Sequence, residues 1–212
     1  MPRAPSPEVR RALIERAAGL LARREPVTLR SLVEGIGVST MAVYTYFDGM
    51  PGLWGAVRQE GFHRLALRLA SVERRRDPVR HLADLGVAYV RNALASPDLY
   101  RVMFDAASHL PDPAAAAAAF EPLVTGARRA QDLGRFRADA DPGDIALRYW
   151  ADGHGVTSLT VTGVLTTEDL RRLAPAMEVA QFVAAGDAPE RAERSVAAAW
   201  GETSWPTGAR RS

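Results

Sequence analysis

The stretch GVSTMAVYTYF, residues 37–47, decides the fold of the first part of the chain. It follows LRSLVEGIG, residues 29–37, whose apolar residues have helical spacing and whose glycines allow the helix to end. Ser39 can cap the next helix, on which Val43 and Phe47 lie four residues apart and face a core. Two short helices joined by a glycine turn form the helix-turn-helix pattern, in which the second helix enters the major groove of DNA.

A helix is predicted on each side of this motif. The first begins at Ser6 and Pro7, an N-cap followed by a first-turn proline, and its apolar spacing continues to about Arg24. The fourth begins at Pro51 and runs towards Arg76, where an Asp-Pro pair breaks the chain.

The rest of the chain also has a helical pattern. Each later apolar segment follows one of the start signals SPDL, PDP, DADPGD, TTED and GDAPE. The β-branched segment GVTSLTVTGVL, residues 155–165, reads as a strand in isolation, but its continuity with residues 144–154 favours a long helix. We therefore predict an all-α fold.

Composition restricts the class of protein. The chain has 212 residues, of which 47% are apolar, so it can bury a core. It has no apolar run of about eighteen residues and no signal peptide pattern, so we expect a soluble, cytoplasmic protein without membrane contact. With no cysteine and four scattered histidines, we expect no disulfide, metal site or cofactor.

Charge is distributed unevenly along the chain. Residues 1–76 hold 13 arginines against 7 acidic residues, a net +6, whereas residues 77–212 hold 14 against 18, a net −4. The basic part suits a polyanion partner, although basic surface also serves solubility.

The helix after Ser39 leaves Thr40, Tyr44, Thr45 and Tyr46 pointing partly outward. Hydroxyl groups in this position can bind phosphates or base edges, and Met41 can meet a thymine methyl group. The two tyrosines can equally cover the core of the three helices with their rings.

These residues resemble a known family. TLRSLVEGIGVSTMAVYTYFDGMPGLWGAV, residues 28–57, is similar to the DNA-binding domain of TetR-family transcriptional regulators, and the match extends over residues 8–57. The resemblance implies phosphate contacts from Thr28, Arg30, Tyr44 and Tyr46, base contacts from Thr40, Met41 and Thr45, and a capping or phosphate-donor role for Ser39.

The sequence departs from the family pattern at one point. The family has a lysine near the start of helix four that contacts phosphate, whereas this chain has Met50, with the acidic Asp48 nearby. The amides that open helix four, or a nearby arginine, can compensate. The candidate arginines are Arg3, Arg10, Arg11 and Arg58.

A second resemblance lies in RYWADGHGVTSL, residues 148–159, which is similar to the Trp-His-Gly (WHG) type of regulator ligand domain through Trp150, His154 and Gly155. On a helix the tryptophan and the histidine share a face. The same pair also fits an ordinary core.

The resemblances imply two domains and a function. Residues 1–50 would form the DNA-binding domain, joined by helix four to a helical ligand-binding and dimerisation domain in residues 51–212. The last long helices, residues 144–163 and 168–185, would form a four-helix homodimer interface. The protein would be a repressor that binds a palindromic DNA operator and is released by a small, mostly apolar effector. Candidate effector contacts, which also fit core positions, are Tyr89, Met103, Phe104, Phe120, Trp150, His154, Met177 and Phe182.

Two other classes stay open. A helical enzyme would have to use Asp105 with His109, or Asp152 with His154, and no nucleophile or phosphate loop accompanies either pair. A helical carrier or partner-binding protein without specific DNA affinity is the second alternative. Our leading prediction is a DNA-binding regulator rather than an enzyme.

Overall fold

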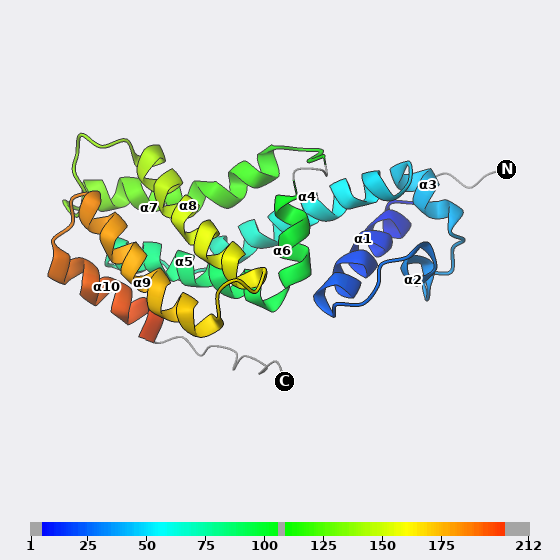
Figure 1. Ribbon diagram of the computed structural model, residues 1–212. Helices are drawn as coiled ribbons and strands as arrows, with labels where there is room; N and C mark the ends of the chain where they lie inside the picture. The colour runs from blue at the N-terminus through cyan, green and yellow to red at the C-terminus, as the bar shows by residue number, and fades with distance from the viewer. Residues whose placement is uncertain (1–5, 106–108, 202–212) are drawn as a thin grey trace. The chain divides into compact units, whose positions relative to one another are not determined.

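The computed structural model describes residues 6–105 and 109–201, which form helices and no strand (Figure 1). The predicted all-α fold is confirmed for this part of the chain. None of the helices within it is long and apolar enough to cross a membrane. The helices are α1 (Pro7–Ala22), α2 (Leu29–Val33), α3 (Met41–Phe47), α4 (Met50–Ala70), α5 (Pro78–Ala95), α6 (Pro97–Phe104), α7 (Ala114–Asp132), α8 (Pro142–Val161), α9 (Thr167–Ala184) and α10 (Pro189–Gly201).

The later helices begin at the predicted start signals. The N-cap Asp141 of α8 accepts a hydrogen bond from the Asp144 N–H at 2.9 Å. At the start of α9, Thr166 and Asp169 form a capping box, in which each side chain accepts from the other residue's N–H. Helix starts were predictable because these signals act locally.

The predicted ends of two helices were too late. Helix α1 ends at Ala22, and Arg24 takes a left-handed conformation with φ of 58°. Helix α4 ends at Ala70 instead of continuing to the arginine run, because the Ser71 hydroxyl donates to the Arg68 carbonyl oxygen at 2.7 Å and satisfies one of its last acceptors.

The predicted cap of α3 was also displaced by one residue. Thr40 occupies the N-cap position, with near-helical φ and ψ of −58° and −24°, and its side chain makes no capping hydrogen bond. Ser39 contributes its carbonyl oxygen, which accepts from the Ala42 N–H at 2.9 Å. Both hydroxyl groups are therefore exposed and not used as caps.

Helix α8 settles the conformation of the β-branched segment. It runs through this segment to Val161, so the predicted long helix is confirmed. The Thr160 hydroxyl donates to the Val156 carbonyl oxygen at 2.8 Å, four residues back, which allows a β-branched residue to fit the helix.

The chain divides into two compact units. The first comprises residues 1–66 and 93–117, and the second comprises residues 67–92 and 118–212. Helices α4, α5 and α7 contribute residues to both units, so neither unit is a single uninterrupted segment of sequence.

The first unit has an apolar core. Helix α1 packs against α2 and α6, and the short α3 precedes α4 along the chain (Figure 1). Its fully buried side chains come from several helices. They include Leu13, Leu32, Val43, Leu53 and Val57.

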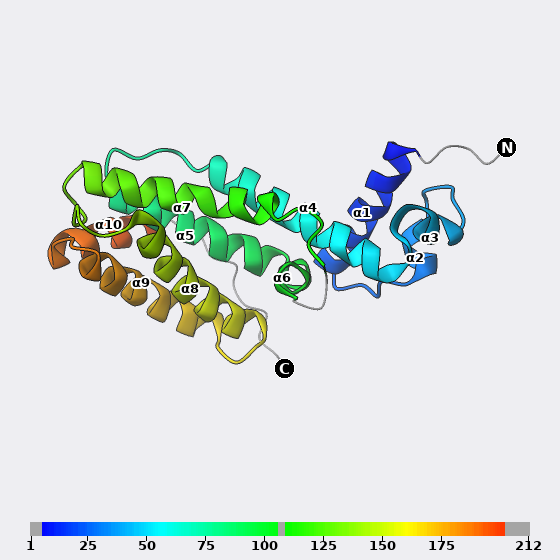
Figure 2. The same cartoon turned by 90° about the horizontal axis from the view of Figure 1, so that it is seen from above.

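The second unit has a layered helical core. Helix α8 runs along α9, and α9 runs along α10 (Figure 2). The ring of Phe182 lies between those of Phe136 and Tyr149, with centroid distances of 5.8 and 5.1 Å, and is fully buried. Phe182 therefore belongs to the core.

This core contains a buried carboxyl group on α9. Glu178 accepts from the Trp200 Nε1–H at 2.9 Å and lies 2.9 Å from the Tyr149 hydroxyl, which also lies 3.0 Å from the Leu82 carbonyl oxygen. Burial raises the pKa of Glu178 to about 8. A protonated Glu178 can donate to Tyr149, which then donates to Leu82, so every group is satisfied. Gly86 provides the space, because a Cβ there would clash with both hydrogen-bonding side chains.

Candidate nucleic-acid interface and ligand site

One face of α3 consists of exposed side chains suited to a duplex. Met41 and Tyr44 are 63% and 51% exposed, and Thr40 and Thr45 are exposed beside them. The opposite face of α3 is buried in the core of the first unit. The Thr45 hydroxyl donates to the Met41 carbonyl oxygen at 3.0 Å, which fixes its orientation and leaves its oxygen able to accept.

The turn before α3 depends on two glycines and a capped helix. Gly35 and Gly37 have φ of 80° and 77°, a left-handed conformation that other residues adopt at a cost. Helix α2 begins with a capping box in which Thr28 and Ser31 exchange side-chain to backbone hydrogen bonds of 2.9 and 3.1 Å. Thr28 is exposed, and its hydroxyl already serves this cap.

Tyr46 lies between the end of α3 and the start of α1. Its hydroxyl oxygen accepts from the Ser6 N–H at 2.8 Å, and its ring is half-buried next to Phe47. Its hydroxyl hydrogen has no acceptor within the described part of the chain. Tyr46 is therefore held in place with its donor available to a phosphate.

Cations stand at both ends of this surface. Arg30 is exposed on α2 and has no carboxylate partner among the described residues. The guanidinium of Arg10 lies over the Phe47 ring, 5.3 Å from its centroid. Asp48 ends α3 in a left-handed conformation with φ of 57° and is exposed.

Three other arginines were candidates to compensate for the phosphate-contacting lysine that the TetR-family pattern has near the start of helix four. Of these, Arg11 is exposed on α1. Arg58 donates from Nε to the Met103 carbonyl oxygen at 2.8 Å and so is engaged within the first unit. Arg3 lies outside the described residues. Arg10 and Arg11 are thus the exposed candidates.

The second unit brings four of the predicted effector contacts together. The Trp150 ring stacks on His154 with a centroid distance of 5.3 Å and meets Phe120 edge to face at 6.4 Å. The Tyr89 hydroxyl lies 2.9 Å from His154 Nδ1. Three helices, α5, α7 and α8, therefore contribute to one aromatic cluster of Tyr89, Phe120, Trp150 and His154.

The imidazole of this cluster is half-buried. Burial lowers the pKa of His154 below its ordinary value, so the imidazole is uncharged near neutral pH. A neutral imidazole has one donor and one acceptor nitrogen, and which nitrogen carries the proton depends on the hydrogen bond with Tyr89.

Thr157 lies on the same face of α8 as Trp150 and His154 and was not identified from the sequence. It lies three residues after His154 and seven after Trp150, a spacing that places all three on one face of α8. Thr157 is completely buried, and its hydroxyl has no hydrogen-bond partner within the described residues. A buried hydroxyl without a partner is costly, so a ligand or water is expected to satisfy it.

The remaining predicted contacts lie elsewhere. Met103 and Phe104 belong to α6 and the first unit, where the Phe104 ring meets Phe62 at 5.6 Å. Met177 is half-buried on α9 in the second unit. Gly155 follows His154 on α8, and a Cβ there would meet nothing within 4 Å.

The acid and base pairs considered for an enzyme do not form on a helix face. Asp152 accepts a hydrogen bond from Gln181, whereas the His154 ring meets Tyr89. Helix α6 ends before Asp105, and residues 106–108 between it and His109 lie outside the described residues. No group of three or more potential metal ligands occurs in the described ranges.

Comparison with known proteins agrees with this architecture. Residues 82–179 match the family profile described as tetracyclin repressor-like, C-terminal domain. None of the curated proteins matches the sequence.

Solved structures share the fold over most of the chain. A protein of unknown function from Rhodococcus sp. RHA1 is 25% identical, with a TM-score of 0.71 over 88% of this chain and 100% of its own. RolR in complex with its ligand resorcinol is 18% identical, with a TM-score of 0.66 over 89% and 93%. SmeT, the repressor of the Stenotrophomonas maltophilia multidrug efflux pump SmeDEF, is 21% identical, with a TM-score of 0.55 over 82% and 89%. The chain thus has the fold of tetracycline repressor-like regulators.

Proposed function

We propose that the protein is a TetR-family transcriptional regulator, a cytoplasmic homodimer that represses transcription from a palindromic operator and is released by a small aromatic effector. The observation that carries this proposal is the exposed face of α3, whose hydroxyl groups and methionine lie opposite a fully buried face. Side chains on such a helix can reach base edges in the major groove.

Each exposed side chain has a role that its chemistry supports. Thr40, Met41 and Thr45 would read base edges, since a threonine donates, accepts and offers a methyl group. Tyr44, Tyr46 and Arg30 would hold phosphates. Ser39 and Thr28 are exposed beside them and can add hydrogen bonds to the DNA backbone.

A dimer is needed to place two reading helices on one operator, with half-sites about 34–36 Å apart. Helix α8 offers a surface for it, because Leu147, Ala151, Gly155 and Leu159 follow at intervals of four and are not buried. Leu147 and Leu159 are 52% and 44% exposed. Open space at Gly155 permits close approach of a second copy. We therefore propose α8, with its neighbour α9, as the dimer interface.

The effector would bind at the aromatic cluster. Trp150 and Phe120 offer ring faces and edges, and Tyr89, His154 and Thr157 offer neutral polar atoms. A ring compound with one or two hydroxyl groups suits both requirements. RolR, which shares the fold, was crystallised with resorcinol, a compound of this kind. The Trp-His-Gly type of ligand domain is part of this proposal.

Helices that continue from the second unit into the first would transmit effector binding and so release the DNA. Tyr89 lies four residues before Ala93, where α5 passes into the first unit, and Phe120 lies three residues after Ala117, where α7 leaves it. A ligand that shifts these helices can move residues of the first unit without a hinge in the sequence. A coupling of about 1–3 kcal/mol changes operator affinity by about five- to 150-fold.

The test is fluorescence anisotropy of the protein against DNA from upstream of its own gene and against a scrambled duplex, over a salt series. We expect tight binding to the upstream duplex that weakens steeply with salt. Resorcinol, phenol and benzene are then added, and the hydroxylated rings should release the DNA. Equal weak binding to both duplexes, with retained binding of phenol or resorcinol, would favour the carrier alternative.

A further inference from the structure

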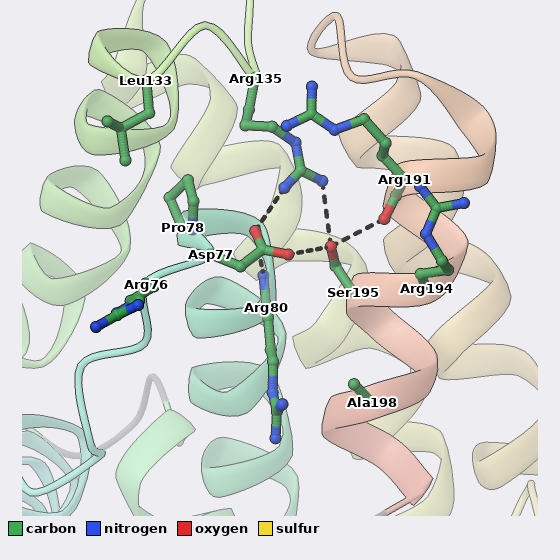
Figure 3. A pocket seen from close by; sticks show the side chains of 10 residues that line it. All are labelled: Arg76, Asp77, Pro78, Arg80, Leu133, Arg135, Arg191, Arg194, Ser195 and Ala198. Atoms are coloured by element: carbon green, nitrogen blue, oxygen red, sulfur yellow. Dashed lines mark hydrogen bonds and ion pairs between the residues drawn. The ribbon is translucent and has the colours of Figure 1, made fainter.

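A ligand-sized pocket lies in the second unit, outside the aromatic cluster. Its volume is about 590 Å³, within the range that accommodates small molecules. It is formed by the start of α5, the residues after α7 and the outer face of α10 (Figure 3). Arginines dominate its lining: Arg76, Arg80, Arg135, Arg191 and Arg194.

Arg135 is anchored at the base of the pocket. Its side chain is 5% exposed, and two of its nitrogens bind the buried Asp187 carboxylate at 2.7 and 2.5 Å. A third nitrogen binds Asp77 at 2.5 Å, and the Ser195 hydroxyl lies 3.1 Å from the guanidinium. This network fixes the position of the guanidinium, and Figure 3 shows its bonds to Asp77 and Ser195.

The acidic group in the lining is bound to Arg135. Asp77 accepts from Arg135, from the Ser195 hydroxyl at 2.6 Å and from the Val79 N–H at 3.0 Å. These hydrogen bonds and the guanidinium charge outweigh desolvation and lower the pKa of Asp77 below its ordinary value. Asp77 and Asp187 share the single guanidinium of Arg135, so these three residues carry a net charge of −1. The four other lining arginines leave the pocket with a net charge of +3.

Three further arginines of the lining have exposed side chains. Arg191 and Arg194 belong to α10 on one side of the pocket, and Arg76 lies on the opposite side (Figure 3). All three are exposed, and no carboxylate pairs with any of them in the part of the chain that the structure describes. Like charges gathered around one hollow repel one another, and a bound anion would remove that repulsion.

The apolar part of the lining indicates that the ligand has an organic part and is larger than an inorganic ion. Pro78, Leu133 and Ala198 provide apolar surface beside the guanidinium groups. Guanidinium forks match the oxygens of phosphate and carboxylate groups. We propose that this pocket binds a small organic anion carrying at least two negative charges, such as a phosphate ester or a polycarboxylate, as a second ligand distinct from the neutral effector.

The first experiment is isothermal titration of the full chain with pyrophosphate and, separately, with citrate, at constant ionic strength. We expect saturable binding of at least one anion, and an affinity at least about tenfold weaker in the double variant Arg191→Gln, Arg194→Gln. The matched control is Arg128→Gln, Arg171→Gln, which removes the same charge from exposed positions of α7 and α9. This control should bind the anion as the parent does.

Three results would overturn the proposal. One is the lack of saturable binding of either anion at millimolar concentration, and another is an equal loss in the control. The third is a loss of affinity for DNA in the pocket variant as large as its loss for pyrophosphate, because the arginines would then serve a duplex. Circular dichroism of each variant checks the fold, and all four substituted residues are exposed.

Discussion

The two units differ in what they bury. Within the described residues, the buried core of the first unit is entirely apolar, whereas the second unit buries Arg135, Thr157, Glu178, Asp187 and Ser195. A polar group is expensive to bury, and its state depends on protons, ions and ligands. The packing of the first core is therefore expected to be insensitive to pH and ions, whereas that of the second core depends on them.

The largest expected effect comes from breaking the buried ion pair of the second unit. Asp187→Ala removes the buried, two-bond partner of Arg135, which keeps only the half-buried Asp77 and the Ser195 hydroxyl, and should lower the free energy of unfolding by about 3–5 kcal/mol. Urea titration followed by circular dichroism measures this. The control Asp139→Ala removes an 87% exposed carboxylate that lies 3.9 Å from Arg137, and it should cost less than about 0.5 kcal/mol. Similar losses of unfolding free energy in Asp187→Ala and Asp139→Ala would contradict the expected difference between the buried and the exposed ion pair.

The matching change in the first unit removes apolar volume. Leu32 is completely buried on α2, so Leu32→Ala should lower the free energy of unfolding by about 3 kcal/mol. The loss should be independent of pH, because no buried titratable group surrounds it among the described residues. Urea titrations at two pH values check this, and a pH-dependent loss would show that the first unit also responds to protons.

Glu178 should make the stability of the second unit depend on pH. Its pKa is about 8 when folded and 4.5 in the reference state, so the folded protein holds a proton that the unfolded chain releases. This stabilisation is complete below pH 4.5 and is lost as the pH rises through about 8. Between about pH 5.5 and 7.5, the parent should lose about 2–3 kcal/mol more than Glu178→Gln.

The exposed Glu168→Gln, on the same helix, serves as the control for this measurement and should follow the parent. If the parent and Glu178→Gln have parallel pH profiles, the carboxyl group is not protonated in the folded state. Thermal unfolding at fixed ionic strength gives the profiles.

A smaller effect is expected on the surface of the first unit. Tyr44→Phe removes a phosphate donor and should weaken binding to every duplex by about 1 kcal/mol. Thr40→Ala should instead alter the preference at one base position. Anisotropy with specific and random DNA separates the two, and equal losses on both duplexes for both variants would contradict these roles.

The smallest expected effect is an increase, not a decrease, in the free energy of unfolding. Thr157→Val replaces a buried hydroxyl without a described partner by a methyl group, and should raise the free energy of unfolding by up to about 1 kcal/mol while weakening effector binding. Thr160→Val is the control on the same helix, because the Thr160 hydroxyl already has an acceptor at 2.8 Å. A destabilised Thr157→Val with unchanged binding of resorcinol would remove Thr157 from the site.

The sequence predicted the features that depend on neighbouring residues. Helix starts follow from side chains within one turn, and the shared face of Trp150 and His154 follows from their spacing. The contact of His154 with Tyr89 joins residues 65 positions apart, and nothing local indicates it. Thr157 was missed because a β-branched residue in an apolar segment resembles ordinary packing.

The arginine pocket was missed for a related reason. Its basic side chains come from three separate segments, and each arginine alone resembles a solvated surface residue. Their common location is a property of tertiary structure.

Because α4, α5 and α7 have residues in both units, they limit which segments of the chain can be exchanged with another protein. A fragment cut after Ala66 would lack α6, which packs against α1 in the first unit. A chimera that places the first unit on another protein of this fold would have to carry residues 93–117 as well, through two further junctions. Under the function proposed above, DNA specificity should therefore be exchanged by substitutions on α3 more readily than by exchange of whole units.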